Sequence, residues 1–153
     1  MTKLEVLKRV PFVRELNDEE LKILADMAKE ESFQVGQELQ KQGRSVDKLY
    51  VIEEGLVGIY LEVGPMARRQ LQSASNFEVV NWASMLPPYR ATATARAIET
   101  TRVLTFDAKE LMKLCDEKPA IGNKVHRGLA SLIAVRLRNA FTQLMGVTGS
   151  QDY

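Results

Sequence analysis

Residues 47–61 read DKLYVIEEGLVGIYL, a pattern typical of antiparallel β structure. Residues 49–52 and 56–61 are rich in β-branched, aromatic and other apolar side chains, and residues 53–55 between them end in a glycine. Two such runs joined by a short glycine-containing turn predict a β-hairpin. The centre of the chain is therefore expected to be a sheet.

Further strand patterns lie on both sides of this hairpin. Phe33 and Val35 alternate with polar residues, which is the two-residue period of a strand with one buried face. Leu39 lies in another short strand, and further strand patterns cover residues 68–72, 93–97 and 103–106. Counting all of them gives seven or eight short strands at hairpin spacing, which predicts an antiparallel sandwich or barrel.

Helical patterns lie at the two ends of the chain. Residues 3–9 and 17–29 predict two short helices, and Asn17 with Glu20 has the spacing of a capping box. After the strands, Asp107 is a suitable N-cap for a helix over residues 109–114.

The longest periodic pattern begins at Pro119 and reaches about Met145, and Gly146 and Gly149 are expected to end it. A helix of this length is about 40 Å long, which is more than one small domain covers. We therefore expect its apolar stripe to meet a second copy of the chain and to form a homodimer.

Residues 76–97 read NFEVVNWASMLPPYRATATARA and hold the chain's only Trp, Trp82. The pattern predicts one helical turn, a rigid turn at Pro87 and Pro88, and a strand entered directly after Arg90. Backbone N–H groups at a helix start and an arginine fork attract anions, so this corner is a candidate anion site. A structural turn with a surface arginine is the alternative.

Composition excludes several classes of protein. The 153 residues carry a net charge of +1, which argues against a dedicated nucleic-acid binder. One Cys and one His form neither an intramolecular disulfide nor a zinc site. His126 has no nucleophile at triad spacing, so we expect no catalysis. The lack of a long apolar run and of a signal peptide predicts a soluble cytoplasmic protein with no membrane contact.

Two motifs carry a resemblance to a known family. The first is F-x-x-G-x-x-L-x-x-x-G in Phe33, Gly36, Leu39 and Gly43. The second is D-x-L-Y-V-I-x-x-G-x-V in Asp47, Leu49, Tyr50, Val51, Ile52, Gly55 and Val57. Together they resemble the cyclic-nucleotide-binding domain family, which includes the effector domains of the catabolite activator protein and of the regulatory subunit of protein kinase A.

The resemblance implies an eight-stranded antiparallel β-barrel of the jelly-roll type, with N-terminal helices and a long C-terminal helix. One domain would cover residues 1–153, with N-terminal helices in 1–30, the barrel in 31–107, C-terminal helices in 108–146 and a tail in 147–153. The last helix resembles the dimerisation helix of the family.

The resemblance also implies a ligand site. In the family a Gly-Glu pair binds the ribose, and an arginine followed by small residues binds the cyclic phosphate. Arg90, Ala91 and Thr92 resemble the arginine end of this motif, while Asn81 and Trp82 stand where the Gly-Glu pair is expected. The implied ligand is a cyclic nucleotide or another small anionic effector, with no metal and no further cofactor.

Two functions remain open at this point. The first is a regulatory effector-binding module with an altered site, because an indole replaces the acid that would read the ribose. The alternative is a binding-dead barrel in which Trp82 fills the pocket and the domain serves for dimerisation or protein docking. About eight residues follow Met145, too few for a recognition helix, so we expect no direct DNA binding.

Overall fold

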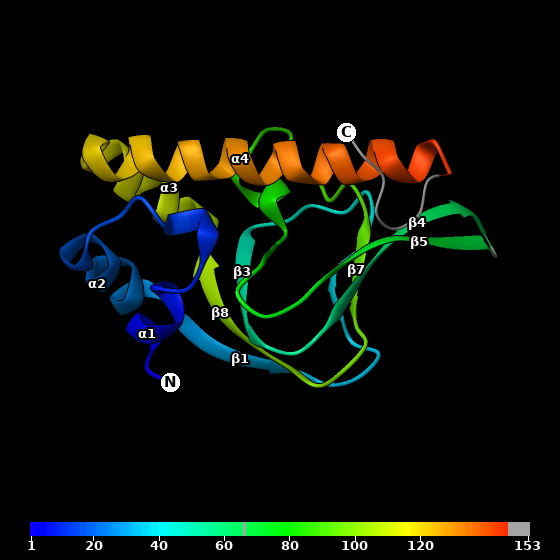
Figure 1. The fold of residues 1–153 in the computed structure, drawn as a ribbon, viewed down its shortest axis with the longest axis horizontal. Helices are drawn as coiled ribbons and strands as arrows, with labels where there is room; N and C mark the ends of the chain where they lie inside the picture. The colour runs from blue at the N-terminus through cyan, green and yellow to red at the C-terminus, as the bar shows by residue number, and fades with distance from the viewer. Residues whose placement is uncertain (66, 147–153) are drawn as a thin grey trace.

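The computed structural model describes residues 1–65 and 67–146, which form two antiparallel sheets with helices around them (Figure 1). Sheet A holds, in order, β1 (Lys29–Phe33), β8 (Thr101–Asp107), β3 (Lys48–Glu54) and β6 (Val79–Val80). Sheet B holds, in order, β2 (Glu38–Gln40), β7 (Thr94–Ala97), β4 (Val57–Gly64) and β5 (Ala67–Ala74). The eight strands confirm the antiparallel β core that the sequence predicts.

The prediction of a closed barrel is wrong, because the strands form two separate four-stranded sheets. The edge strands β6 and β2 are only two and three residues long, so they offer little backbone for pairing across the gap. The eight strands are therefore arranged as a sandwich of two sheets rather than as one continuous ladder.

The predicted hairpin over residues 47–61 is also wrong. β3 pairs with β6 and β8, whereas β4 pairs with β5 and β7, so the chain changes sheets at Gly55. Other segments occupy the donors of this turn: the Gly55 N–H donates to Asn76, and the Leu56 N–H donates to Thr101. Gly55 has a φ of 140°, and a Cβ there would lie 2.4 Å from Oγ1 of Thr101. Only glycine fits this corner.

The helices follow the capping signals of the sequence. They are α1 (Lys3–Leu7), η1 (Pro11–Val13), α2 (Asp18–Met27), η2 (Trp82–Met85), α3 (Ala108–Glu117) and α4 (Pro119–Leu144). Asn17 and Glu20 form the predicted capping box, since each side chain accepts from the other residue's backbone N–H at 2.9 Å. Asp107 caps α3 by accepting from the N–H of Glu110 at 3.1 Å.

The long helix α4 runs along one side of the molecule, from α3 past sheet A to the β4–β5 hairpin (Figure 1). It packs closely on η1, because a Cβ on Gly128 would lie 1.9 Å from the carbonyl oxygen of Phe12. Gly146, with a φ of 68°, follows the end of the helix as predicted. Gly149 and the predicted tail, residues 147–153, lie outside the described residues.

Two hydrophobic clusters form the core. The larger one lies between sheet A and the helices and includes Leu7, Leu24, Leu49, Leu104, Leu111 and Val125. The smaller one lies between the two sheets and includes Leu39, Ile52, Val57, Ala95 and Val103. This packing fixes α4 against the sheets and so determines which of its side chains face inward.

Candidate functional site

The segment between β6 and β7 carries all five ligand residues that the sequence predicts. Asn81 leaves β6 with a left-handed φ of 76° and begins η2. Tyr89 is also left-handed, with a φ of 58°, and the next residue, Arg90, forms an isolated bridge with Ser45. Asn81 directly before η2 and Tyr89 four residues after it are left-handed, so the chain turns sharply at both positions.

A cavity of about 310 Å³ lies beside η2, between sheet B and the C-terminal half of α4. This volume is at the lower end of the range for small-molecule sites. The cavity is lined by Gln40, Ile59, Leu71, Gln72, Val79, Val80, Asn81, Trp82, Thr92, Ala93, Ile133, Arg136, Leu137 and Ala140.

Three of the five predicted site residues meet at this cavity, namely Asn81, Trp82 and Thr92. Arg90 is exposed, and its Nη1 donates to the carbonyl of Gly43 at 3.0 Å. Ala91 is buried, and its backbone N–H donates to the carbonyl of Arg44 at 2.9 Å. Arg90 and Ala91 are thus held against the turn around residues 43–45 and lie outside the lining of the cavity.

Trp82 has two different neighbours. It is half-buried and packs against the larger hydrophobic cluster, and it also lines the cavity. The indole therefore forms one wall of the cavity and leaves the volume beside it free.

Arg136 of α4 is a site residue that the sequence analysis misses. Its Nη1 donates to Oε1 of Gln72 at 3.1 Å, and its Nη2 donates to the carbonyl of Val79 at 3.2 Å. Burial lowers the pKa of this guanidinium, and the negative charge of Glu78 opposes that effect. None of the ion pairs formed within residues 1–65 and 67–146 includes Arg136. A partly desolvated cation with only neutral hydrogen-bond partners makes Arg136 a candidate functional residue.

A sequence signal for Arg136 does exist. It lies three residues after Ile133 and four before Ala140, so all three lie on one helical face, and all three line the cavity. A charged residue within an otherwise apolar stripe that faces the domain is the signal to look for.

Two other cavity residues each have a buried side-chain oxygen without a hydrogen-bond partner among the described residues: Oδ1 of Asn81 and Oε1 of Gln40. The amide nitrogen of Asn81 donates to the carbonyl of Lys48 at 2.6 Å, and that of Gln40 donates to the carbonyl of Ala93 at 2.7 Å. Since only the amide nitrogen can donate to a carbonyl, both amide orientations are fixed and both oxygens remain acceptors.

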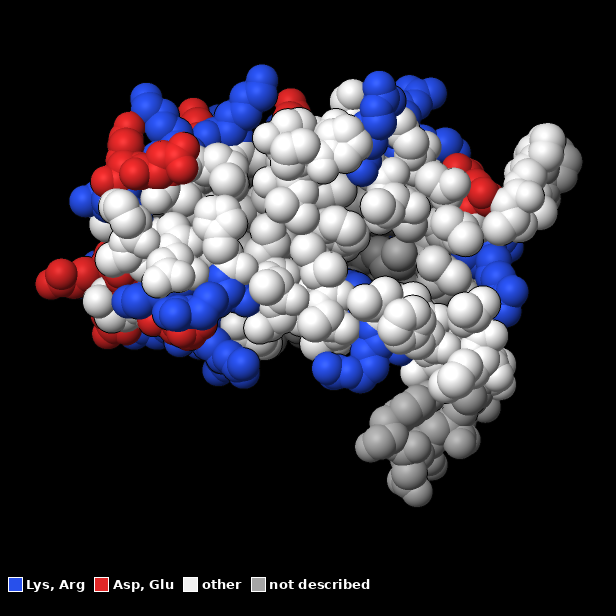
Figure 2. Space-filling model, turned by 90° about the horizontal axis from the view of Figure 1, so that it is seen from above, with Lys and Arg blue, Asp and Glu red and all other residues white. Residues whose placement is uncertain are grey.

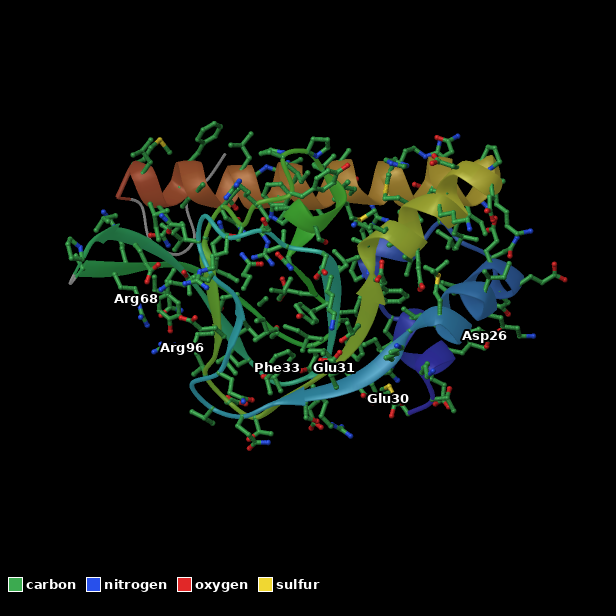
Figure 3. The ribbon with its side chains drawn as sticks, turned by 180° about the vertical axis from the view of Figure 1, so that it is seen from behind. Asp26, Glu30, Glu31, Phe33, Arg68 and Arg96 are labelled. Atoms are coloured by element: carbon green, nitrogen blue, oxygen red, sulfur yellow. The ribbon has the colours of Figure 1, made fainter. Side chains whose placement is uncertain are left out.

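The other charges near this region have different partners. Oε1 of Glu78 accepts from the backbone N–H of Ser75 at 2.9 Å and from its hydroxyl at 3.1 Å. Arg68 lies over the ring of Tyr60, and Arg96 pairs with Glu38 at 3.6 Å. Figure 3 shows Arg68 and Arg96 on the side of sheet B that faces away from α4, so neither contributes to the cavity.

The side chains suited to catalysis or metal binding lie elsewhere. Nδ1 of His126 is 2.7 Å from the carbonyl of Gly122 on its own helix. Cys115 is buried, and burial raises the pKa of its thiol. Within the described residues, no group of three or more His, Cys, Asp or Glu is placed to hold a metal ion. No helix in the same part of the chain is long and apolar enough to cross a membrane.

The chain is similar in sequence and in fold to known proteins. The chain is 23% identical over 122 residues to a protein of Rhodopseudomonas palustris described as a potassium channel protein, and the match covers 80% of this chain and 29% of that protein. The chain thus spans less than a third of the length of this curated relative.

Two solved structures resemble the whole fold. One, described as a cyclic nucleotide-binding protein of Geobacter metallireducens, is 26% identical, with a TM-score of 0.77 and coverage of 90% of this chain and 99% of that one. The other is the catabolite activator protein of Thermus thermophilus, which is 25% identical, with a TM-score of 0.74 and coverage of 88% and 61%.

The family model of the cyclic nucleotide-binding domain matches residues 30–118, which is more than half of the chain. This segment contains both sheets, η2 and α3. The chain belongs to the cyclic nucleotide-binding domain family.

Proposed function

We propose that this chain is a regulatory module that binds a small anionic effector and catalyses no reaction itself. The effector binds in the cavity between sheet B and α4, where Asn81, Trp82 and Thr92 meet. One observation supports this most directly: a guanidinium without an acidic partner among the described residues lines a ligand-sized cavity. An anion is the natural complement of such a group.

The ligand site is non-standard in this proposal. Asn81 and Trp82 stand where the family resemblance expects a Gly-Glu pair, and Glu78 is held by Ser75. The ribose hydroxyl of a cyclic nucleotide then has no carboxylate to bind. A buried polar group without its partner costs about 1–3 kcal/mol, so cAMP and cGMP are weak ligands.

A second candidate is a binding-dead domain that serves for dimerisation or docking. The contact of Trp82 with the larger hydrophobic cluster favours it, because the indole then acts as a core side chain. The free volume beside the indole favours effector binding instead.

The proposal includes a homodimer formed through α4. Large apolar side chains near the end of this helix are exposed, and Leu144 is the most exposed of them at 84%; the others are Val135, Leu137, Phe141 and Met145. Figure 2 looks onto the α4 side and shows a band without charge along the middle, with Asp and Glu gathered mainly at the end of the molecule that carries α2 and α3. A second copy of the chain would cover the exposed apolar side chains within this uncharged band.

Titration with cAMP, cGMP, AMP and adenosine, followed by calorimetry and by the fluorescence of Trp82, tests the proposal. We expect a saturable change with the anionic compounds and a dissociation constant for cAMP and cGMP weaker than about 1 μM. A tighter constant for cAMP contradicts the altered site. A blue emission that no compound changes supports the binding-dead domain.

A further inference from the structure

Arg136, rather than Arg90, is the residue that we infer receives the charge of the effector. We propose that the cavity selects an anion that also carries a hydrogen-bond donor, with Arg136 binding the anionic group and Asn81 or Gln40 accepting from the donor. This inference rests on the proposed function, because it assigns roles within the same cavity.

The charge balance of the cavity is the first argument. Arg136 is the single charged residue among the described residues that line the cavity. Burial already lowers the pKa of its guanidinium, which reflects the cost of removing a cation from water, and the charge of Glu78 offsets only part of that cost. An anion in the cavity would supply the missing charge.

The hydrogen-bonding capacity of Arg136 is the second argument. A guanidinium has five N–H donors, and two of those on Arg136 are seen donating, to Gln72 and to Val79. These two bonds hold the planar group in place beside β6. Donors that remain suit the bidentate recognition of a phosphate or a carboxylate.

Arg90 offers the weaker alternative. It is exposed, its guanidinium is bound to the carbonyl of Gly43, and it lies outside the lining of the cavity. To reach the cavity it would have to leave that carbonyl, whereas Arg136 already lines it.

The two amide oxygens indicate what else the ligand carries. Oδ1 of Asn81 and Oε1 of Gln40 are buried acceptors without partners, and their amide nitrogens are fixed on backbone carbonyls. A buried acceptor without a donor is destabilising. A ligand donor such as an amino or hydroxyl group that reaches either oxygen removes this deficit.

Three probes separate the parts of this inference: cAMP carries both an anion and donors, adenosine carries donors alone, and inorganic sulfate is a compact anion that has no donor at neutral pH. Binding is measured in the full chain by calorimetry and by the NMR resonances of the Trp82 indole and the Arg136 guanidinium. We expect cAMP to bind more tightly than either of the other two probes. Sulfate binding as tightly as cAMP overturns the requirement for a donor beside the anion.

Variants then test the role of Arg136. Arg136→Gln should weaken the binding of cAMP by about 10–100-fold and abolish the preference for cAMP over adenosine. Gln72→Glu keeps Arg136 in place but gives its guanidinium a carboxylate partner. This variant should therefore also weaken the binding of cAMP, by at least about 10-fold. Arg138→Gln is the matched control, because Arg138 is exposed on the same helix and does not line the cavity.

The outcomes separate this inference from the proposed function. If cAMP shifts the Trp82 resonance and binds wild type and Arg136→Gln equally, Arg136 is not the receptor, although the cavity still binds an effector. If Arg90→Gln weakens the binding of cAMP and Arg136→Gln does not, Arg90 is the residue that receives the charge of the effector. If no probe shifts either resonance at about 10 mM, both the inference and the proposed function are overturned.

Discussion

Arg136 and Gln72 bind each other twice: Nη1 of Arg136 donates to Oε1 of Gln72 at 3.1 Å, and Nε2 of Gln72 donates to the backbone carbonyl of Arg136 at 3.2 Å. Gln72 lies on β5 and Arg136 on α4, so this pair ties the helix to the edge strand of sheet B. Both residues also line the cavity, which means that the tie and the candidate site share the same side chains.

This tie should be measurable in a double-mutant cycle of Gln72→Ala and Arg136→Ala. We expect each single change to lower the free energy of unfolding, and the pair to show a coupling of about 0.5–1.5 kcal/mol, because both variants remove the same bond between Nη1 of Arg136 and Oε1 of Gln72. Urea denaturation of the four proteins gives the coupling. Strictly additive effects would show that the bond between the two side chains does not stabilise the fold.

Gly128 should be intolerant of alanine. In an exposed helix interior, glycine to alanine gains about 1 kcal/mol. Here a Cβ would lie 1.9 Å from the carbonyl oxygen of Phe12, so Gly128→Ala should instead lower the free energy of unfolding by roughly 1–3 kcal/mol. Asn139→Ala, on the exposed side of the same helix, is the control and should change stability by less than about 0.5 kcal/mol. A stabilised Gly128→Ala would disprove the close contact between α4 and η1.

Acid should weaken the contact between α2 and α4. Lys124 donates to Oε1 of Glu20 at 2.7 Å, and this bond, with the backbone N–H of Asn17, lowers the pKa of the Glu20 carboxyl from its ordinary value of 4.5. A carboxyl whose pKa is lower in the folded state stabilises the fold above its unfolded pKa, and that contribution is lost as the pH falls through the folded value.

Glu20→Gln should therefore lower stability at neutral pH and reduce the further loss of stability below about pH 4.5. Thermal denaturation across this range measures the effect. Glu117→Gln is a suitable comparison, because Glu117 forms an exposed pair with Lys113 at 3.9 Å and its loss should change stability at neutral pH little. An unchanged profile in Glu20→Gln would show that another carboxyl is responsible.

The apolar surface of α4 leads to a prediction about assembly. Phe141 is 55% exposed and does not line the cavity, so it probes the surface without disturbing the site. Phe141→Glu should convert a dimer into a monomer, because a buried unpaired charge is strongly unfavourable at an interface. Light scattering and circular dichroism would show a halved mass with unchanged secondary structure. A wild-type protein that is monomeric at high concentration would refute the dimer.

Local signals in the sequence predict the helices well, and pairing between distant segments is harder to predict. Each helix cap joins residues only three positions apart, so the sequence predicts it directly. The pairs are Asn17 with Glu20 and Asp107 with Glu110. The partners of β3 and β4 lie up to several tens of residues away, and the sequence around Gly55 suits either a hairpin or a change of sheet.

The site shows the same limit. Asn81, Trp82 and Thr92 come together because they flank one short turn, which the sequence can indicate. The direction of Arg90 depends on the carbonyl of Gly43, which local pattern does not show. The apolar stripe of α4 indicates that Arg136 faces the domain, but the cavity that it reaches depends on how α4 docks.

Trp82 supplies the last prediction, because one Trp in the chain makes its fluorescence report on one place. The indole is half-buried, with the larger hydrophobic cluster on one side and the cavity on another. Trp82→Ala should therefore lower the free energy of unfolding by roughly 1–3 kcal/mol, less than the roughly 3–5 kcal/mol expected for a fully buried aromatic residue. Trp82→Phe keeps most of the apolar contact and should cost less than Trp82→Ala, as denaturation will show.

The same indole should respond to ligand. An aromatic anion that enters the cavity can stack on Trp82 while its charge meets a guanidinium, and such stacking contributes about 0.5–1.5 kcal/mol beyond burial. In the free protein the indole should be accessible to a neutral quencher such as acrylamide, and a bound nucleotide should reduce this quenching. The contrary outcome is that Trp82→Ala lowers the free energy of unfolding by the full amount of roughly 3–5 kcal/mol. If, in addition, the emission is blue and no nucleotide changes its quenching by acrylamide, the indole belongs to the core. The domain would then be a dimerisation or docking module rather than a sensor.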